Sequence, residues 1–339
     1  MIDIHPINIC LAHLTSRACM KKILLKTIAV LTFISASAFA VAVAQPSKQI
    51  QVLIGFPPGG PNDSSGRAVA EYINTKSSYQ ATVFNKTGAF GQLALKSAID
   101  DKNNSVVMAS SSSFVFNRVM LDKLIVEPLQ DFTIIGPMLH SPLAVFTTKN
   151  SQVTKLTDFK NINKLNCGVS NQAAMLASKV LFNELQISVE VIQYKGSAQL
   201  LQGILSGEIE CGVDVLATFG QYHNSGMMRI VAISGDSKLP NFESVPLMKE
   251  TIKDKKHYRL THYSSWFALM VPNRLKHSDF ETSILPLLYQ INQDSEFVNR
   301  VQKMGFYVST PTKNFEKTLQ DEFEYWESVR KQFQIEKSN

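Results

Sequence analysis

The chain lacks the residue patterns that mark common catalytic sites. It has four cysteines and seven histidines among 339 residues, with no His-Glu-x-x-His motif and no Cys/His spacing typical of zinc. Gly168, Val169 and Ser170 do not complete a Gly-x-Ser-x-Gly motif. The turn at Gly59 and Gly60 lacks the Gly-Lys-Ser/Thr ending of a phosphate-binding loop. These absences argue against a metalloenzyme, a serine hydrolase and a nucleotide-binding enzyme, and we expect no cofactor and no catalytic residue.

Long hydrophobic stretches are also scarce, and the main one lies in an N-terminal targeting segment. Lys21, Lys22 and Lys26 precede an apolar stretch, and Ala-Val-Ala at residues 42–44 fits a cleavage site before Gln45. We therefore predict a leader over residues 1–44. Within it, residues 20–44 form a signal peptide and residues 1–19 an over-extended start, so that the mature protein is periplasmic. An uncleaved membrane anchor is the alternative interpretation.

Charge of one sign is scarce once the leader is removed. The whole chain has a net charge of +6, which falls to +3 when Arg17, Lys21, Lys22, Lys26 and Asp3 are removed with the leader. A charge of this size, spread over so long a chain, does not indicate a nucleic-acid partner. It is compatible with an anionic ligand without requiring one.

The most informative segment present is a strand, a rigid turn and a helix start at residues 50–67. Residues 50–56 form the short apolar run expected of a buried strand. Two prolines and two glycines follow, and Asn62 or Asp63 is placed to cap the next helix. A helix N-terminus at the mouth of a sheet has free N–H groups that suit an anion such as a carboxylate.

Short apolar runs alternate with helical patterns along the chain, which predicts an α/β fold with parallel-rich sheets. Polar turns follow two further expected strands at residues 105–110 and 166–169, and a strand at 189–194 precedes a helix that Ser197 would cap. Apolar segments near 143–149 and 265–271 suit two crossings between lobes. We predict a first lobe of residues 45–145 plus 270–339 and a second of residues 146–269, with ligands at the strand ends that face one cleft.

Five motifs in this order resemble the substrate-binding proteins of tripartite tricarboxylate transporters, also called the Bug family. They are residues 56–61 with Asp63 and Arg67; residues 85–92; residues 194–196; residues 206–210 with Asp214; and residues 265–268. The resemblance covers essentially all of the predicted mature chain. It implies a two-lobed periplasmic binding protein fold of the type II kind, with a hinge of two crossings, that works as a monomer.

The same resemblance implies capture of a small carboxylated metabolite by lobe closure, for delivery to a membrane permease or a sensor kinase. A di- or tricarboxylate, an acidic amino acid or an aromatic acid would fit. Alternatives are a periplasmic enzyme on the same fold and the binding protein of an ATP-driven transporter. The expected ligand-binding residues are Phe56, Pro58, Gly59, Gly60, Pro61, Asn62, Asp63, Ser110, Ser111, Ser112, Ser170, Asn171, Gln172, Tyr194, Lys195, Gly196 and Asp214.

The chain departs from the family pattern at three places, the first being Asn62, where the family usually has Thr or Ser. Thr87, Phe90 and Gln92 differ from the usual residues of the second motif, and Phe90 puts bulk where a glycine gives room. The loop at residues 170–175 has no family-like Gly/Ser-rich turn and has Met175 near the usual histidine position. The resemblance therefore leaves the identity of the ligand open.

Several residues have a structural alternative to a binding role. Arg67 and Lys195 could pair with a ligand carboxylate or with a protein carboxylate. Asp214 could receive a ligand donor or fix a neighbouring loop. Cys167 and Cys211 would lie on neighbouring strands, yet we expect two reduced, buried thiols, because adjacent parallel strands seldom allow disulfide geometry.

Overall fold

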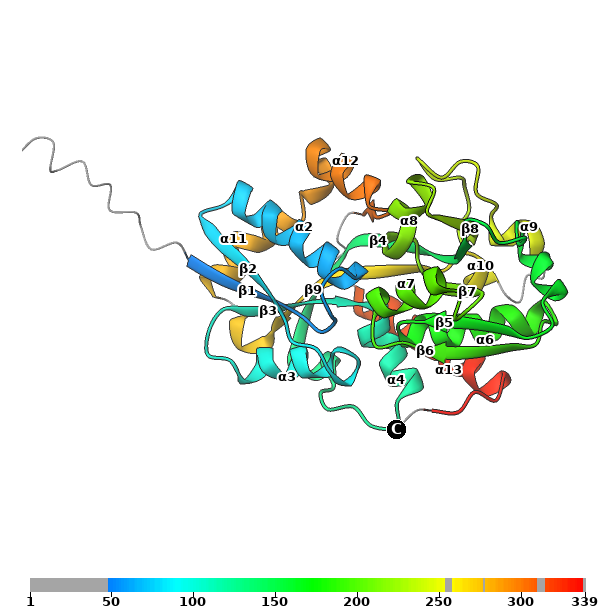
Figure 1. Cartoon of the computed structure of the whole chain (residues 1–339). Helices are drawn as coiled ribbons and strands as arrows, with labels where there is room; N and C mark the ends of the chain where they lie inside the picture. The colour runs from blue at the N-terminus through cyan, green and yellow to red at the C-terminus, as the bar shows by residue number, and fades with distance from the viewer. Residues whose placement is uncertain (1–47, 254–257, 277, 310–314, 338–339) are drawn as a thin grey trace, which may run out of the picture. The chain divides into compact units, whose positions relative to one another are not determined.

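The computed structural model describes residues 48–253, 258–276, 278–309 and 315–337 (Figure 1). The predicted leader, with Cys10 and Cys19, lies outside these residues. The strands are β1 (Lys48–Ile54), β2 (Tyr79–Asn85), β3 (Ser105–Ser110), β4 (Phe132–Thr148), β5 (Leu165–Val169), β6 (Val189–Gln193), β7 (Cys211–Val215), β8 (Met228–Ile233), β9 (Ser264–Pro272) and β10 (Tyr307–Val308).

The longer helices lie between these strands and after them. They are α2 (Pro61–Lys76), α3 (Gln92–Asp100), α6 (Gln172–Glu184), α7 (Ser197–Ser206), α8 (Leu216–Asn224), α11 (Asp279–Leu288), α12 (Ser295–Lys303) and α13 (Phe315–Gln332). The short ones are α4 (Asn117–Met120), α5 (Pro128–Asp131), α9 (Met248–Thr251), α10 (Tyr258–Thr261), η1 (Ala89–Gly91), η2 (Ser112–Phe116), η3 (Leu156–Asn161), η5 (Asn273–Leu275) and η6 (Ile291–Gln293). In the described part of the chain, no helix is long and apolar enough to cross a membrane.

All ten strands belong to one mixed sheet in which two parallel units are joined by β4. The order is β2-β1-β3-β9-β4-β7-β5-β6, with β8 and β10 also paired to β4. We call β2, β1, β3, β9, β10 and residues 132–142 of β4 the first half-sheet. Residues 143–148 of β4 with β7, β5, β6 and β8 are the second half-sheet. The predicted α/β class with parallel units is confirmed, and β4 runs as one continuous strand into the first predicted crossing.

Strand alternation explains why helices cover both faces of the first half-sheet. Ile50, Val52 and Ile54 of β1 pack with the apolar face of α2, while Leu53 packs with α3. Successive side chains of a strand point to opposite faces, so a strand covered by helices on both sides must be apolar throughout. Figure 1 shows α2 and α3 on opposite sides of these strands. The second half-sheet follows the same rule, with α6 and α7 packed in different core clusters.

The two crossings between the half-sheets lie side by side and share one hydroxyl. The β4–β9 pairing ends at Pro142 opposite Ser264, and the β4–β7 pairing begins at Leu143 opposite Val215. Ser234, just after β8, accepts the Leu143 N–H at 2.8 Å and donates its hydroxyl to the Tyr263 carbonyl. One side chain therefore ties together the chain segments at both crossings, close to the positions that the sequence predicts.

Helix α13 packs across this region, as its apolar spacing predicts. The Trp326 ring is buried against Phe116 and Tyr263, with ring centroids 5.0 and 5.5 Å apart. Glu322, one turn before Trp326, accepts a hydrogen bond of 2.8 Å from the indole N–H of Trp266 on β9. This carboxylate links α13 to the strand that forms the second crossing.

Glu322 should make stability depend on pH. Burial raises the pKa of this carboxyl from 4.5 to about 7, although the Trp266 N–H and the nearby Arg259 act to lower it. The folded protein therefore holds a proton that the unfolded chain releases between these pH values. The group's contribution is fully present below pH 4.5 and is lost as pH rises to about 7, by up to about 3 kcal/mol.

Urea unfolding of Glu322→Gln at pH 5 and pH 7.5 measures this effect. The amide stays neutral and can still accept the Trp266 hydrogen bond, so the decline between the two pH values should shrink by about that amount. Glu316→Gln, an exposed position on the same helix, is the matched control and should keep the wild-type profile. A Glu322→Gln profile identical to wild type would show that Glu322 is ionised in the fold at both pH values.

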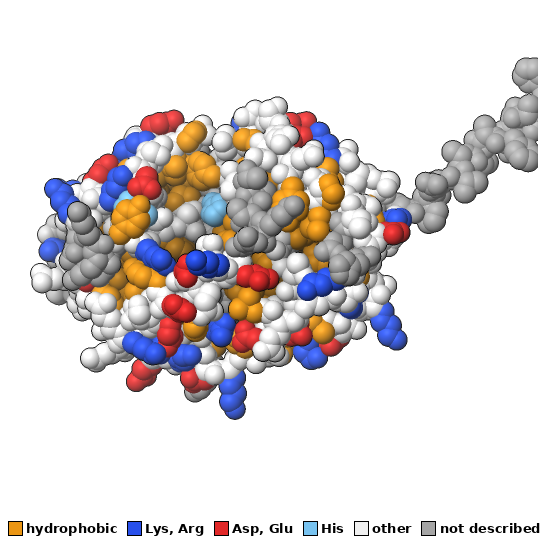
Figure 2. All heavy atoms as spheres, turned by 180° about the vertical axis from the view of Figure 1, so that it is seen from behind, with side chains coloured by type: hydrophobic (Ala, Val, Ile, Leu, Met, Phe, Trp, Pro, Cys, Tyr) orange, Lys and Arg blue, Asp and Glu red, His pale blue; other side chains and the backbone are white. Residues whose placement is uncertain are grey.

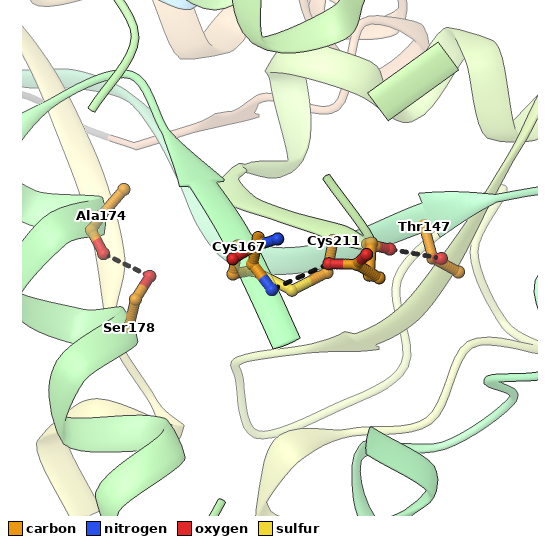
Figure 3. The surroundings of a disulfide bond; sticks show 7 residues. Thr147, Cys167, Ala174, Ser178 and Cys211 are labelled. Atoms are coloured by element: carbon orange, nitrogen blue, oxygen red, sulfur yellow. Dashed lines mark hydrogen bonds between the residues drawn. A yellow bond between two sulfur atoms is a disulfide. The ribbon is translucent and has the colours of Figure 1, made fainter. Parts of the chain in front are cut away.

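The two cysteines expected to be free form a disulfide (Figure 3). Cys167 of β5 and Cys211 of β7 are direct partners in the parallel ladder, with Cα atoms 4.6 Å apart. This separation is within the range that a disulfide spans. The expectation of two reduced thiols is wrong because it applied a general objection to parallel neighbours, while the register here places the two cysteines opposite each other.

Candidate functional site

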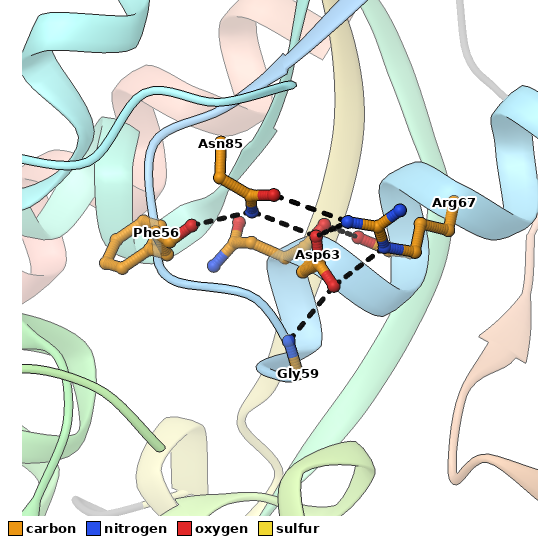
Figure 4. Close-up of polar contacts among 7 residues, drawn as sticks. Phe56, Gly59, Asp63, Arg67 and Asn85 are labelled. Carbon is orange, nitrogen blue, oxygen red and sulfur yellow. Dashed lines mark hydrogen bonds and ion pairs between the residues drawn. The ribbon is translucent and has the colours of Figure 1, made fainter. Parts of the chain in front are cut away.

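The turn after β1 is fixed by a buried carboxylate rather than by a capping side chain. Helix α2 has Gly60 at its N-cap and Pro61 in its first turn, without a side-chain cap, so the expected capping by Asn62 or Asp63 is wrong. Asp63 instead accepts the Gly59 N–H at 3.0 Å, the Arg67 Nε–H at 2.9 Å and the Asn85 amide at 2.9 Å (Figure 4). Burial acts to raise the pKa of Asp63, but these donors outweigh it and hold the pKa below its usual value.

This network gives Arg67 a structural role and leaves the turn rigid. Both Arg67 nitrogens that contact Asp63 lie within 3.0 Å of its oxygens. The Asn85 amide also donates to the Phe56 carbonyl at 2.9 Å, which ties the end of β2 to the turn. Pro58 and Gly59 are exposed, while Gly60 and Pro61 are buried.

A second buried carboxylate fixes the loop between β5 and α6. Asp214 at the end of β7 is fully buried and accepts hydrogen bonds from the Ser170 hydroxyl, the Asn171 amide at 2.9 Å and the Val215 N–H at 2.8 Å. Burial raises the pKa of Asp214 above its usual value, although these donors act to lower it. Asn171 in turn caps α6 by accepting the Ala174 N–H at 2.9 Å. Asp214 therefore fixes this loop through the hydrogen bonds that it accepts from Ser170 and Asn171.

Four helix starts meet between the two half-sheets. Those of η2 and α6 are linked by a 3.3 Å hydrogen bond from the Ser112 hydroxyl to Asn171. Those of α2 and α7 are in contact: a Cβ on Gly60 would lie 3.3 Å from the Ser197 hydroxyl oxygen, and one on Gly196 would lie 3.1 Å from the Pro57 ring. Positive dipole ends and N–H groups from both half-sheets are thus gathered in one place.

Two local expectations about these helix starts are wrong. Helix α7 has Gly196, not Ser197, at its N-cap, because the extended backbone at Gly196 allows Pro57 to lie against it. The polar loop expected at residues 110–113 is instead the start of a buried π-helix, η2. The Ser111 hydroxyl is hydrogen-bonded to the Tyr263 hydroxyl at 2.6 Å and to the Ser265 hydroxyl at 2.8 Å. These hydrogen bonds hold the start of β9 in place.

A cavity of about 420 Å³ opens beside these helix starts. Four of the expected site residues line it: Phe56, Ser170, Tyr194 and Lys195. The adjoining wall was not among the expected site residues, although Thr87 and Phe90 in it depart from the family pattern. The remaining lining residues are Gly55, Pro57, Thr87, Gly88, Ala89 and Phe90.

Three of the expected site residues have buried polar atoms without a protein partner. They are Asn62 Oδ1, Ser110 Oγ and Gln172 Oε1, on residues exposed by 6%, 1% and 2%. Asn62 and Gln172 are in the first turns of α2 and α6, and Ser110 ends β3. Buried polar groups are nearly always hydrogen-bonded, so such atoms indicate where a ligand or water completes the structure.

On the face drawn in Figure 2, charged side chains of one sign are not gathered in one area of the surface. Lys and Arg side chains are interspersed there with Asp and Glu side chains, and hydrophobic side chains form several small patches among them. In the described residues, no group of three His, Cys, Asp or Glu side chains is placed to hold a metal ion. The helix starts around the cavity therefore remain the clearest indication of a binding site.

Some known proteins are similar to this chain in sequence, and others are similar in fold. BugT of Bordetella pertussis is 24% identical over 319 residues, covering 88% of this chain and 94% of BugT. An R. palustris protein solved with adipate has a TM-score of 0.79 at 18% identity, covering 86% of this chain and 99% of that one. MatC from Rhodopseudomonas palustris with bound malate has a TM-score of 0.70 at 18% identity, covering 84% and 99%. The fold is the two-lobed one of these periplasmic binding proteins.

The family model extends over most of the chain. The model described as "Tripartite tricarboxylate transporter family receptor" matches residues 66–333, which include β2 to β10, the disulfide and all of the helix starts around the cavity except that of α2. Members of this family are periplasmic receptors that bind solutes. The chain therefore belongs to the tripartite tricarboxylate transporter receptor family, as the five sequence motifs predicted.

Proposed function

We propose that this protein binds a small carboxylate in the cavity between two lobes that close on it. The first lobe would comprise residues 45–145 and 270–339 and the second residues 146–269, with residues 143–145 of β4 and 264–269 of β9 paired in the half-sheet of the other lobe. The protein would act as an exported, monomeric periplasmic receptor without catalytic activity. It would deliver its ligand to a membrane permease or present it to a sensor kinase.

The convergence of helix starts is the observation that supports this proposal best. Helices α2 and α6 direct their N-terminal ends from the two half-sheets toward the same region, which favours negative charge there. Asn62 and Gln172, whose amide oxygens have no protein partner, lie in these two first turns. An amide can present either its oxygen or its N–H groups, so both can turn to a carboxylate. Lys195 adds a positive charge at the cavity wall.

The bound small molecules of two solved structures with this fold also support the proposal. The R. palustris protein was solved with adipate, and MatC with malate. Both ligands are small carboxylates, although at 18% identity each neighbour supports the fold of this chain rather than its ligand. A charged carboxylate would be stabilised here by backbone and amide donors more than by ion pairs.

Titration calorimetry of the mature protein with a panel of carboxylates tests the proposal. At least one acid should bind and raise the melting temperature, because it binds only the folded form. Lys195→Met should weaken binding by up to about fivefold, as expected for a solvent-exposed ion pair. Lys164→Met, an exposed lysine that does not line the cavity, is the matched control. Failure of every acid to bind or to stabilise the protein would contradict the proposed function.

A further inference from the structure

The cavity wall contains a bulky side chain in a backbone conformation that usually requires glycine. Four successive residues have positive φ: Gly88 at 134°, Ala89 at 44°, Phe90 at 51° and Gly91 at 92°. Glycine adopts such angles freely, whereas a Phe there is an outlier whose backbone is strained. Residues kept in such conformations gather at binding and active sites, which makes the Phe90 ring a candidate for a function.

Surrounding contacts hold Phe90 in this conformation. Its carbonyl accepts the Asn117 amide at 2.7 Å, and the Gly91 N–H donates to the Gly88 carbonyl at 3.0 Å. Gly91 is wedged between the Phe56 ring and Ser113, since a Cβ there would lie 3.3 Å from each. The loop therefore cannot relax the Phe90 backbone without breaking these contacts.

Two more aromatic rings line the same cavity and are equally fixed. Phe56 lies against Gly91, as described above. The Tyr194 ring fits over two glycines, because a Cβ would lie 2.8 Å from it at Gly168 and 2.6 Å from its hydroxyl at Gly203. That hydroxyl donates to Glu208 at 2.9 Å. Rings that are held in advance offer faces and edges on which a planar ligand stacks with little loss of entropy.

The polar part of the lining is small. Among the described residues that line the cavity, Lys195 has the one charged side chain. The Ser170 hydroxyl is already donated to Asp214, which leaves few side-chain donors for a ligand rich in hydroxyls. One cation beside helix starts suits a single carboxylate, whereas two or three carboxylates would leave negative charge against aromatic faces.

We propose that the ligand is a monocarboxylic acid with an aromatic body, and that Phe90 is a residue that determines this specificity. The carboxylate lies toward the helix starts and Lys195, and the ring of the ligand packs among Phe56, Phe90 and Tyr194. This inference rests on the proposed function and narrows it to one class of carboxylate.

Calorimetric titration of the mature protein with four named acids tests the inference. Benzoate and 3-phenylpropionate represent aromatic monocarboxylates, and malate and citrate represent polar acids with several carboxylates. We expect the better aromatic acid to bind at least tenfold more tightly than malate or citrate. Phe90→Gly should weaken aromatic binding about tenfold without weakening malate or citrate binding, and it should not lower the melting temperature, because glycine suits the backbone there.

Phe84→Ala is the matched control, because Phe84 is an exposed aromatic residue on β2, 42% accessible, that does not line the cavity. It should leave all four affinities unchanged. If malate or citrate binds as well as the aromatic acids do, or if Phe90→Gly leaves aromatic binding unchanged, the inference is overturned while the proposed function stands. If no carboxylate in the wider panel binds, the proposed function fails as well.

Discussion

Replacing both Cys167 and Cys211 with alanine should lower the free energy of unfolding by about 2–4 kcal/mol. The disulfide joins residues 44 positions apart, and closing a loop of that length removes conformational entropy from the unfolded chain worth about 4 kcal/mol. Both cysteines are fully buried, so the missing sulfurs add a small cavity cost. Urea unfolding of the oxidised wild type and of the double variant measures the difference.

Reduced wild-type protein provides the control that separates the bond from the cavity. Under a reductant, wild type should lose most of the same free energy, while the double variant should not respond. Oxidised, unfolded wild type should show no free thiol. Two free thiols in protein purified from the periplasm, or equal stability with and without reductant, would show that the pair is not bonded.

Gly60→Val should weaken ligand binding about ten- to hundredfold. A Cβ at this position lies 3.3 Å from the Ser197 hydroxyl oxygen across the two half-sheets, and the two further methyl groups of valine extend into α7. Overpacking of this kind typically costs about 1–3 kcal/mol, and a cost of this size corresponds to the ten- to hundredfold loss of affinity given above. On the proposed closing mechanism, this contact forms only when the lobes close on the ligand. The melting temperature without ligand should therefore stay near wild type, and small-angle scattering with saturating ligand should show no decrease in radius of gyration.

Variants at Ser197 test whether the clash is the cause. Gly60→Ala should have a smaller effect than Gly60→Val, and Ser197→Ala should restore binding in the Gly60→Ala background because it removes the contacting oxygen. Ser197→Ala alone should bind like wild type. If Gly60→Val leaves affinity and scattering unchanged, the two half-sheets do not close at this contact when ligand binds.

Local sequence signals predicted the elements better than their ends. The apolar run after Lys48, the Pro/Gly turn and the following helix are where expected, because buried parallel strands and proline leave few alternatives. Helix caps were predicted wrongly at Asn62, Asp63 and Ser197. In each case a preceding glycine is the actual N-cap. Asp63 is instead engaged in an i,i+4 ion pair with Arg67, and Gly196 is in long-range contact with Pro57.

The candidate site was only partly visible in the sequence, for a related reason. Residues at strand ends, such as Ser110 and Ser170, could be placed from topology alone. The cavity wall at Thr87 to Phe90 depends on four consecutive positive φ angles, and only two of these residues are glycines. The residue types of Ala89 and Phe90 do not indicate that these two positions adopt positive φ angles. The disulfide likewise depends on register, which long-range pairing sets and local patterns do not.

The continuous strand β4 links the two half-sheets, and we expect it to couple their unfolding. Its 17 residues pair with β9 and β10 at one end and with β7 and β8 at the other. If one end of β4 unfolded, the adjoining end would lose its neighbouring hydrogen-bonded residues. In addition, one apolar cluster contains side chains from β3, β5 and α13, so it belongs to both half-sheets. Movement of the lobes must therefore be absorbed as a bend within intact secondary structure. We therefore expect the two lobes to unfold in one transition, so that a hinge that admits a ligand would not provide a route to partial unfolding.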